Sequence, residues 1–428
     1  MEHLYQIYLQ HPSISTDSRK ISRGDLFFAL KGDNFDGNDY AEKAIESGAA
    51  YAIVDRPSGD HAQFILVPDA LKALQQLAQH HRQMQHIPIF ALTGSNGKTT
   101  TKELITTVLS AKYRVCSTQG NLNNHIGVPL TLLRIDSTTQ MAVIEMGANH
   151  LGEIAVLAAI AQPDYGLITN VGKAHLEGFG SLEGVIQTKG ELYQAAQTLF
   201  VNADNPTLCN MAAQRGGTKE KHFYGLHHQK ASILPTDEQN PFLRLHVPGY
   251  PPIETQLIGA YNADNVLAAL AVGAHFGVDP LLAAEAIQNY RPTNNRSQHM
   301  QTAKNTLIID AYNANPTSMA AALDNFEQLS AAHKVVILGD MLELGADSEL
   351  EHHALVARLF DLQKSAKINQ IFLVGPRLGA AARAHPCCSC FADVNALKAH
   401  LSDSPLIGAV VLIKGSRGIR LEQALELL

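Results

Sequence analysis

The chain of 428 residues lacks several features that would define a class of protein. It has no block of lysine or arginine and its formal charge is −7, so we expect neither nucleic acid nor an anionic membrane as the main partner. No apolar run reaches the ~18 residues that a membrane span needs. The first residues, MEHLYQIYLQHPSIS, lack the basic and apolar regions of a signal peptide, so a cytoplasmic location is expected.

Cysteine is also scarce, and its five residues show no spacing typical of a disulfide framework. An odd number without such spacing fits a reducing compartment. Three of the cysteines, Cys387, Cys388 and Cys390, lie close together and raise the question of zinc. Since a second pair of ligands at finger spacing is missing from the sequence, we favour a short apolar strand near the surface.

What the sequence does contain is a regular alternation of apolar runs and helical patterns. At about 150 residues per domain, the length predicts three domains. Residues 1–86 are typical of a small α/β unit, with strands at 25–30 and 49–55 and a helix at 40–49. Residues 87–298 and 299–428 alternate strands with helices, which predicts an α/β fold with parallel sheets covered by helices. The polar stretch RPTNNRSQ at 291–298 is the expected hinge.

The stretch TGSNGKTTTKE at 93–103 is similar to a phosphate-binding loop, although the strict pattern requires glycine where Leu92 stands. An apolar run precedes it and a helical pattern follows, which is the arrangement that such a loop needs. The glycines let backbone N–H groups turn toward a phosphate, and the start of the helix adds partial positive charge. Lys98 is predicted to reach the phosphates and the Thr99 hydroxyl to join Mg²⁺. The predicted ATP or GTP site comprises Gly94, Ser95, Asn96, Gly97, Lys98, Thr99 and Thr100.

Polar residues follow two other apolar runs of the middle region. Ligands bind outside the carboxyl ends of the strands in an open parallel sheet. Glu145 ends the run MAVIE and is therefore a candidate for holding Mg²⁺, with an exposed glutamate at a strand end as the alternative. His175 follows YGLITNVG in a glycine-rich loop, where the phosphates are expected. The spacing of Lys189 is that of a lysine on a helix surface.

Four further residues are candidates for nucleotide or anion binding. Asn262 and Asn265 stand at the start of a helical pattern. Helix capping would explain one asparagine there, whereas two asparagines three residues apart could also present their amides to the edge of an adenine. Asp310 ends an apolar run and can accept a ribose hydroxyl. Lys414 ends another run, before Gly-Ser-Arg, and forms a candidate anion site.

Taken together, the motifs of the chain resemble those of the Mur ligase family. The stretches that carry the resemblance are TGSNGKTTTKE, NLNNHIGVPLTLL, EMGANHLGEI, TNVGKAHLEGFGS, TKGELY, NADN, DAYNANPTSM and LGDMLELG. The likeness covers nearly the whole chain, from STDSRKISRGDLFFALKG to KGSRG. It implies a domain for the UDP-sugar-peptide at 1–86, an ATP-binding domain at 87–298 and a Rossmann-like domain at 299–428. Three of the motifs, NLNNHIGVPLTLL, DAYNANPTSM and LGDMLELG, favour the branch that adds D-alanyl-D-alanine to UDP-N-acetylmuramoyl-tripeptide.

The activity implied by the resemblance is ATP-dependent amide formation through an acyl phosphate, giving ADP and phosphate. ATP and Mg²⁺ would be the cofactors, and the two peptides the small-molecule substrates. The setting would be peptidoglycan precursor synthesis in the cytoplasm, by a monomer. The family's phosphate loop also lacks the first glycine, which accounts for Leu92.

The resemblance also implies roles for individual residues. Lys98, Glu145, His175 and Lys189 would be catalytic, with Lys189 carbamylated by CO₂ and holding a second Mg²⁺. Thr99, Glu145 and His175 would be the other metal ligands. Asn262 would contact adenine, and Arg296 and Asp310 the phosphates and ribose. The substrate contacts would be Ser18, Arg19, Lys31, Asn121, Asn124, Asn313, Asn315 and Lys414.

The chain departs from the family pattern at two positions. Asn295 precedes Arg296 where a glycine is common, and Asn38 stands in DGNDY where a histidine is common. Both concern fine contacts rather than the class of reaction. The alternatives are another branch of the family, such as a diamino-acid-adding ligase or a folylpolyglutamate synthase, a nucleotide-dependent switch or partitioning protein, and a binding module without catalysis.

Overall fold

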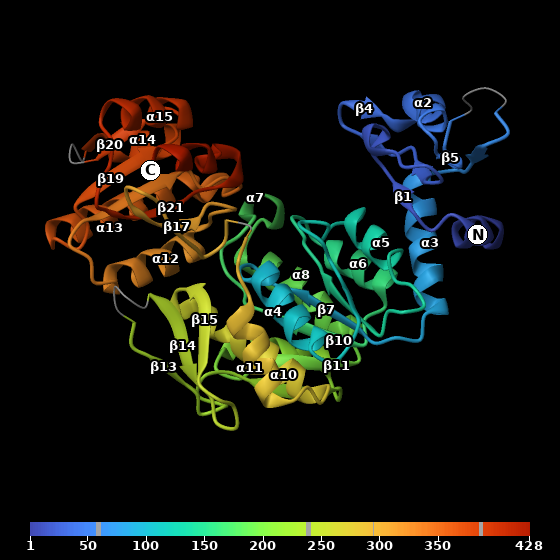
Figure 1. The fold of residues 1–428 in the computed structure, drawn as a ribbon, viewed down its shortest axis with the longest axis horizontal. Helices are drawn as coiled ribbons and strands as arrows, with labels where there is room; N and C mark the ends of the chain where they lie inside the picture. The colour runs from blue at the N-terminus through green and yellow to red at the C-terminus, as the bar shows by residue number, and fades with distance from the viewer. Residues whose placement is uncertain (57–60, 237–240, 294, 385–387) are drawn as a thin grey trace.

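The computed structural model describes residues 1–56, 61–236, 241–293, 295–384 and 388–428. They form three regions in chain order, each built around its own main sheet (Figure 1). No helix within these ranges is long and apolar enough to cross a lipid bilayer. The predicted α/β fold with three domains is confirmed, and the exact domain boundaries stay a prediction.

The N-terminal region has a parallel sheet in the order β1-β2-β5-β6. Strands β2 and β5 lie within the predicted runs at 25–30 and 49–55, and helix α2 lies within the predicted helix at 40–49. The elements are α1 (Glu2–Gln10), β1 (Ile14–Ser15), β2 (Leu26–Phe28), β3 (Lys31–Gly32), β4 (Phe35–Asp36), α2 (Ala41–Glu46), β5 (Tyr51–Val54) and β6 (Phe64–Leu66).

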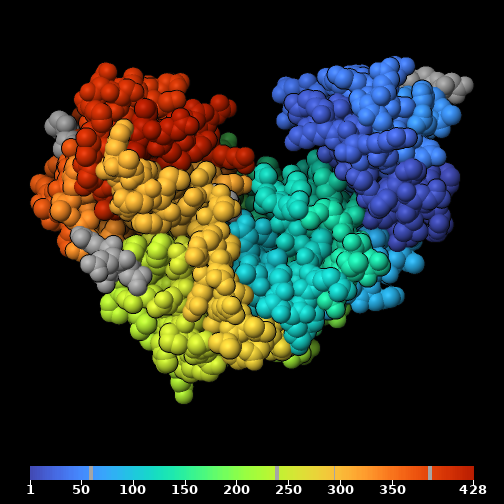
Figure 2. Space-filling view, viewed as in Figure 1, coloured from blue at the N-terminus to red at the C-terminus, as the bar shows by residue number. Residues whose placement is uncertain are grey.

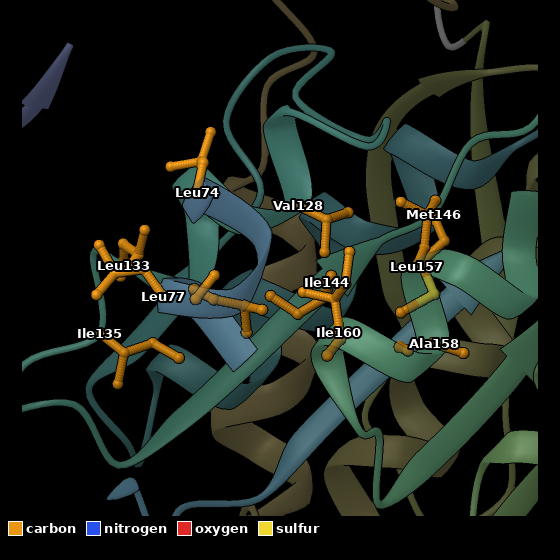
Figure 3. Packing of buried hydrophobic residues seen from close by; sticks show 14 of the residues in the cluster. Leu74, Leu77, Val128, Leu133, Ile135, Ile144, Met146, Leu157, Ala158 and Ile160 are labelled. Carbon is orange, nitrogen blue, oxygen red and sulfur yellow. The ribbon is translucent and has the colours of Figure 1, made fainter. Parts of the chain in front are cut away.

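Helix α3 (Ala70–Met84) connects this region to the central one. Its side chains at helical spacing, Leu74, Leu77 and Ala78 among them, are buried on one face, and Asp69 caps its first turn by accepting from the N–H of Lys72 (2.9 Å). This face packs on α5 (Gly127–Leu132) and α6 (Glu153–Ala161). Figure 3 shows the packing of Leu74 and Leu77 beside residues of the central region, so the two regions share one core.

The central region is a six-stranded parallel sheet in the order β12-β11-β10-β7-β9-β8. Successive residues of the middle strand β7 face opposite sides. Ile89 packs with the helices α6 and α8, and Phe90 packs with α4 and α10. The strands are β7 (Ile89–Thr93), β8 (Val115–Ser117), β9 (Met141–Glu145), β10 (Tyr165–Ile168), β11 (Thr198–Asn202) and β12 (Glu220–Tyr224). The other helices are α4 (Lys98–Ser110), α7 (Leu176–Phe179), α8 (Leu182–Ala195), α9 (Pro206–Gly216), α10 (Ala263–His275) and α11 (Pro280–Asn289).

A small antiparallel sheet, which the strand–helix pattern did not predict, follows the central parallel sheet. It consists of β13 (Ser232–Leu234), β14 (Phe242–His246) and β15 (Ile253–Ile258), in that order. Its strands are short and closely spaced along the chain, which permits hairpin connections without intervening helices. It packs beside α11.

The C-terminal region has a six-stranded sheet in the order β16-β17-β21-β18-β19-β20. All its neighbours are parallel except β16 with β17. The strands are β16 (Gln298–Gln301), β17 (Thr306–Asp310), β18 (Lys334–Gly339), β19 (Gln370–Val374), β20 (Ser389–Phe391) and β21 (Val410–Lys414). The helices α12 (Pro316–Gln328), α13 (Ser348–Lys364), α14 (Pro376–Ala381) and α15 (Val394–Asp403) cover its two faces, as expected for a Rossmann-like domain.

The cysteine cluster lies partly on the edge strand β20. Cys390 is exposed and Cys388 is half-buried, while Cys387 lies outside the described residues. The predicted short strand near the surface is therefore present. Within the described ranges, no three His, Cys, Asp or Glu side chains gather in a way that could hold a metal ion.

The three regions enclose a hollow. In Figure 2 the N-terminal region (blue) and the C-terminal region (red) stand apart above the central region (cyan), and the surface is hollowed between them. The C-terminal region also contacts the central one directly, through a bond between Asn315 Nδ2 and Asn96 Oδ1 (2.7 Å). A substrate that extends across the hollow could therefore contact all three regions.

Arg82, near the end of α3, joins the helix to the central region. Arg82 is 8% exposed. Its guanidinium donates a hydrogen bond of 2.8 Å to Asp164 Oδ2 and further hydrogen bonds to the carbonyl oxygens of Gln85, Ile87, Ala161 and Gln162. Removing one partner from a buried ion pair typically costs 3–5 kcal/mol. Since Asp164 is partly exposed, we expect Arg82→Met to cost about 3 kcal/mol and to lower the midpoint of thermal unfolding by at least about 5 °C.

The matched control for this prediction is Arg134→Met. Arg134 is exposed and makes one long hydrogen bond, 3.3 Å to the carbonyl oxygen of Ser117. Its replacement should move the midpoint by no more than about 1 °C. Equal midpoints for the two variants, measured by differential scanning fluorimetry, would contradict the role given to Arg82.

Candidate active site

The predicted phosphate loop lies between β7 and α4, so the expected strand–loop–helix arrangement is confirmed. Gly94 and Gly97 have φ values of +148° and +78°, which residues other than glycine rarely adopt. A Cβ on Gly94 would lie 2.0 Å from Thr169 Oγ1, and one on Gly97 would lie 2.8 Å from Asn265 Oδ1. Both glycines are therefore required by the close approach of neighbouring residues. Leu92 is buried within β7.

Lys98 begins α4 and folds back over the loop. Its Nζ donates to the carbonyl oxygens of Gly94 (2.7 Å) and Ser95 (3.2 Å). Burial lowers the pKa of Lys98 to about 8, while the charge of Glu145 opposes this lowering and the smaller effect of the Arg296 charge adds to it. An incompletely solvated cation at a helix N-terminus favours an anionic ligand.

Glu145 lies beside the loop, because β9 pairs with β7 and places Glu145 opposite Leu92. It is 1% exposed, so the alternative of an exposed strand-end glutamate is wrong. Oε1 accepts from Asn123 Nδ2 (2.7 Å) and from Thr99 Oγ1 (3.3 Å). Oε2 is buried and has no hydrogen-bond partner among the residues that the structure describes. A buried carboxylate oxygen without a partner is costly unless a cation compensates it.

The donor set at this point fits Mg²⁺. Mg²⁺ prefers oxygen ligands and is usually held by one or two carboxylates, substrate phosphates and water, rather than by a cage made only of protein. Glu145 supplies a free carboxylate oxygen next to the Thr99 hydroxyl. The lack of a three-residue metal cluster in the described ranges is compatible with a metal shared with phosphates.

The strand β10 lies on the other side of β7 and holds the loop in place. Asn170 accepts from the N–H of Asn96 (3.0 Å) and donates to its carbonyl oxygen (3.0 Å), while Thr169 Oγ1 donates to the same oxygen (2.6 Å). The side chain of Asn96 meets Asn315 of the C-terminal region. The loop is thus fixed from two domains.

His175 lies beyond β10, at the start of α7, with φ of +51°. Its imidazole lines the cavity described below, and Nδ1 lies 2.5 Å from Glu343 Oε2. Contact with His175 lowers the pKa of Glu343, against an opposing effect of burial. Whether His175 binds a metal stays a prediction.

Lys189 is buried inside the molecule, and the interpretation as a helix-surface lysine is wrong. It is 1% exposed in α8, with Nζ 3.5 Å from the carbonyl oxygen of Ala148 and 5.3 Å from the centroid of the Phe179 ring. Desolvation, and next the charge of Lys98, lower its pKa well below the usual value. A larger fraction of Lys189 is therefore in the neutral amine form than is the case for an exposed lysine.

Asn262 and Asn265 are buried at the start of α10 and bind each other, with Asn265 Nδ2 donating to Asn262 Oδ1 (2.8 Å). Neither caps the helix with its side chain. Asn262 Nδ2 donates to the carbonyl oxygen of Ile258 (2.8 Å) and to Ser297 Oγ (3.1 Å). Asn265 Oδ1 accepts from Thr101 Oγ1 (3.0 Å), so the pair connects α4, α10 and the predicted hinge segment.

Two of the predicted residues in the C-terminal region form an ion pair. Lys414 Nζ lies 2.5 Å from Asp310 Oδ2, at the adjacent carboxyl ends of β21 and β17. Arg296, from the hinge, lies over the ring of Tyr312, with 3.7 Å between the guanidinium carbon and the ring centroid. Arg296 Nε is buried without a hydrogen-bond partner in the described part of the chain. This guanidinium retains donors for an anion.

The remaining predicted residues have local roles in this structure. Asn315 caps α12 in a reciprocal capping box with Ser318, and Asn313 Oδ1 accepts from the N–H of Ala314 (2.9 Å). Asn124 Oδ1 accepts from the N–H groups at the start of α5, and Asn121 is exposed. Contacts with a substrate are not excluded by these roles and stay predictions.

A cavity of ≈ 910 Å³ brings most of the predicted residues together between the central and C-terminal regions. This volume lies at the upper end of the range for small-molecule sites. The predicted residues that line it are Ser95, Asn96, Gly97, Lys98, Thr100, Asn121, Asn124, Glu145, His175, Asn262, Asn265, Arg296, Asp310, Asn313, Asn315 and Lys414.

The N-terminal candidates lie outside this cavity. Arg19 pairs with Asp17 (2.8 Å), and Lys31 pairs with Asp55 (2.9 Å). Ser18 begins the short 3₁₀-helix that also contains Arg19. Asn38, which replaces the histidine of the family pattern, donates to Asp36 (2.6 Å) and Asp55 (2.8 Å) and is buried. This departure therefore serves a local structural role.

Sequence reasoning missed several residues that line the cavity, among them Asn123, Tyr312, Glu343 and Arg417. Each of these four lies in a stretch that carried the family resemblance, in NLNNHIG, DAYNANP, LGDMLELG and KGSRG. The family motifs therefore pointed to the stretches that contain these residues, but the spacing of residues alone gave no reason to select them from the other residues of each motif.

Comparisons with known proteins agree with this geometry. Family models match the chain as "Mur ligase family, catalytic domain" at residues 12–82, "Mur ligase middle domain" at 92–273 and "Mur ligase, glutamate ligase domain" at 295–417. The UDP-N-acetylmuramoyl-tripeptide–D-alanyl-D-alanine ligase of Bacillus subtilis is 37% identical, over 96% of this chain and 92% of the relative.

Two solved structures are similar over nearly the whole chain. A crystal structure of MurF from Acinetobacter baumannii has a TM-score of 0.84 at 32% identity and covers 97% of this chain and 92% of its own. The MurF ligase from Thermotoga maritima, in complex with ADP, has a TM-score of 0.84 at 25% identity, with 98% and 97% covered. The chain therefore belongs to the Mur ligase family, and within it to the group of the UDP-N-acetylmuramoyl-tripeptide–D-alanyl-D-alanine ligases.

Proposed function

We propose that the chain joins D-alanyl-D-alanine to UDP-N-acetylmuramoyl-tripeptide in an ATP-dependent step of peptidoglycan precursor synthesis. The observation that carries the proposal is the identity of 37% over 96% of the chain to a ligase of that name. The cavity between the central and C-terminal regions, with Lys98 and Arg296 in its lining, supports it. A cytoplasmic location and a monomeric state belong to the same proposal.

The reaction must convert a poor electrophile, a carboxylate, into a good one. In the proposed sequence a carboxylate oxygen of the tripeptide attacks the γ-phosphorus of ATP, and the bond to the bridging oxygen of ADP breaks. The amine of D-alanyl-D-alanine then attacks the acyl phosphate, and phosphate leaves as the amide forms and the amine loses a proton. Lys98 and Arg296 would bind the phosphoryl oxygens whose negative charge must be stabilised.

Magnesium fits the proposed site through Thr99 and Glu145, whose Oε2 is buried without a partner in the described ranges. When bound, it would supply positive charge and in-line orientation to the phosphates. Asn123 holds the other oxygen of Glu145 and so fixes the direction of the carboxylate. The chain itself thus contributes a carboxylate held in a fixed direction to the proposed magnesium site.

Lys189 is the proposed site of carbamylation and, with His175, of contact to a second Mg²⁺. CO₂ reacts with the neutral amine, forming a new N–C bond and releasing one proton, and the product is an anion. Burial and the charge of Lys98 lower the pKa of Lys189 and so favour the reactive form. An uncharged or anionic group is also better suited than an ammonium to a site beside Lys98.

The nucleoside end of ATP is proposed to lie toward Asn262 and Asp310. The amide of Asn262 is engaged with Ile258, Ser297 and Asn265, so contact with adenine would exchange one of these bonds. Asp310 lies beside Lys414, which compensates its charge while it accepts a hydroxyl. Asn265 and Thr100 would support the loop around the phosphates.

The UDP-sugar is proposed to bind the N-terminal region through Ser18, Arg19 and Lys31. The peptide would then cross the hollow toward Asn121, Asn124, Asn313, Asn315 and Lys414, which line the cavity. The side chain of Arg19 is 83% exposed and that of Lys31 is 54% exposed, so both can reorganise around a diphosphate.

One prediction of the phosphate assignment concerns pH. The pKa of Lys98 in the free protein is lowered to about 8, so its charge is lost as the pH rises through that value. Binding of a nucleotide needs the charged form. We therefore expect the Kd of a non-hydrolysable ATP analogue, measured by calorimetry with Mg²⁺, to rise between about pH 7 and pH 9 by about 10-fold.

Lys98→Arg is the control for this pH dependence, because an arginine stays protonated throughout the range. Its Kd should change by no more than about 2-fold over the same interval. A wild-type Kd that does not vary with pH would contradict the assignment of Lys98 to the phosphates.

The first experiment on function measures phosphate release from ATP with UDP-N-acetylmuramoyl-tripeptide, with and without D-alanyl-D-alanine, and identifies the product by mass spectrometry. Release that requires the dipeptide, with a pentapeptide product, is the expected result. Activity with UDP-N-acetylmuramoyl-dipeptide and a diamino acid would instead assign another branch of the family. Phosphate release without any peptide would favour a nucleotide-dependent switch.

A further inference from the structure

The loop that carries His175 is held by the C-terminal region. Glu343, from LGDMLELG between β18 and α13, places Oε2 2.5 Å from His175 Nδ1. The N–H of Glu177 donates to the carbonyl oxygen of Glu343 (3.3 Å). Lys173, which precedes His175 in the loop, forms an ion pair of 2.7 Å with Glu351 of α13. Two short segments from different domains are thus joined at three points.

Backbone conformation sets the central contact apart from an ordinary surface ion pair. His175 and Glu343 have φ values of +51° and +64°, in the left-handed region that residues with side chains seldom adopt. Such conformations persist only where the surroundings hold them, and they concentrate at functional sites. In this structure both members of the same contact have this conformation.

The imidazole has one nitrogen engaged and one free. Nδ1 is buried and lies 2.5 Å from Glu343 Oε2, an ion-pair contact without hydrogen-bond alignment in this structure. Nε2 makes no hydrogen bond with any residue that the structure describes, and His175 lines the cavity. A histidine that binds a metal through one nitrogen commonly donates its other ring N–H to a carboxylate, which fixes the tautomer and the direction of the ring. His175 and Glu343 bring an imidazole and a carboxylate together in the same way across a domain border, at ion-pair distance.

We infer that Glu343 is a positioning residue, which holds the imidazole of His175 in place for contact with the proposed second Mg²⁺. The inference rests on the proposed function, in which His175 contacts Mg²⁺. Since Glu343 belongs to the C-terminal region, the imidazole is oriented only while that region is docked. Completion of the metal site is then coupled to domain closure.

The ion pair of Lys173 and Glu351 provides a matched comparison within the molecule. It joins the same two segments but does not touch the imidazole. If Glu343 serves only to hold the domains together, then Glu343→Ala and Glu351→Ala should have the same effects. If Glu343 orients the metal ligand, only its removal should change metal affinity, and only while His175 is present.

The test measures Mn²⁺ binding to the full chain with ADP by electron paramagnetic resonance, so that it requires no peptide substrate. We expect Glu343→Ala to raise the Kd of Mn²⁺ by about 10-fold, whereas Glu351→Ala leaves it within about 2-fold of wild type. In the His175→Ala background, Glu343→Ala should have no further effect on this Kd. Glu343→Gln keeps an acceptor oxygen and should fall between wild type and alanine.

Steady-state kinetics give a second readout. Glu343→Ala should lower kcat by about 10–100-fold and raise the Mg²⁺ concentration for half-maximal rate, with KM for D-alanyl-D-alanine nearly unchanged. An unchanged Mn²⁺ Kd in Glu343→Ala, or an equal shift with and without His175, would overturn the inference. Should the alanine variant not fold, Glu343→Gln carries the same comparison. A wild-type protein that binds Mn²⁺–ADP but makes no pentapeptide would contradict the proposed function instead.

Discussion

Replacing Lys98 by alanine is expected to lower kcat by at least about 10³-fold, with little change in the fold. Lys98 Nζ lies at the N-terminus of α4, over the phosphate loop, and in the free protein it donates to the carbonyl oxygens of Gly94 and Ser95. A bound phosphate offers it stronger, charge-assisted bonds. Alanine removes this charge at the position where negative charge develops during phosphoryl transfer. The measurement is the rate of pentapeptide formation at saturating substrates.

Lys112→Ala is the matched control, because Lys112 follows the other end of α4 and bonds the carbonyl oxygens of Phe276 and Gly277. Its kcat should stay within about 2-fold of wild type. A near-normal rate for Lys98→Ala would remove the assignment of this loop to ATP. Loss of activity in both variants, with lowered unfolding midpoints, would indicate damage to α4 rather than to the phosphate site.

The position of Glu145 could be predicted because it follows from the rules of parallel sheets. A loop at the carboxyl end of one strand is adjacent to the carboxyl ends of its neighbours, and β9 and β10 both flank β7. The apolar runs in the sequence predicted these strands, and the turn residues after each run predicted where the strands end. The same reasoning predicted Asp310 and Lys414, which lie at adjacent carboxyl ends of β17 and β21.

The burial of Lys189 could not be predicted in this way. Periodicity treats lysine as polar and assigns it to the solvent side, yet Val185, Thr188 and Leu192 of α8 are buried with it. Lys189 is buried by the backbone near Ala148, which is distant in sequence, and by the ring of Phe179 from the preceding helix α7. Only the family resemblance assigned the residue a role before its surroundings were known.

Contacts between domains were also beyond the reach of spacing. Glu343 meets His175, and Asn315 meets Asn96, only because the C-terminal region docks on the central one. No local pattern encodes such a distance. The antiparallel sheet of β13, β14 and β15 was missed for a different reason, since its short strands were read as part of a regular strand–helix alternation.

Replacing Lys189 by alanine is expected to lower kcat by about 10³-fold and to be rescued in part by short-chain carboxylic acids. The side chain is 1% exposed, so truncation leaves a space close to the proposed second metal. Acetate or propionate can fill that space and supply the carboxylate that the carbamate would have provided. We expect the acids to raise the rate of pentapeptide formation by Lys189→Ala at least about 10-fold, with no effect on Lys98→Ala.

Propylamine distinguishes the two forms that Lys189 could take in the active protein. If the working group is an ammonium, the amine should rescue Lys189→Ala and the acids should not. If it is a carbamate, only the acids should act, and wild-type activity should fall in CO₂-depleted buffer and recover with bicarbonate. Because carbamylation requires the neutral amine, that recovery should weaken as the pH falls through the lowered pKa of Lys189. Full activity of Lys189→Ala without any addition would remove the carbamate from the mechanism.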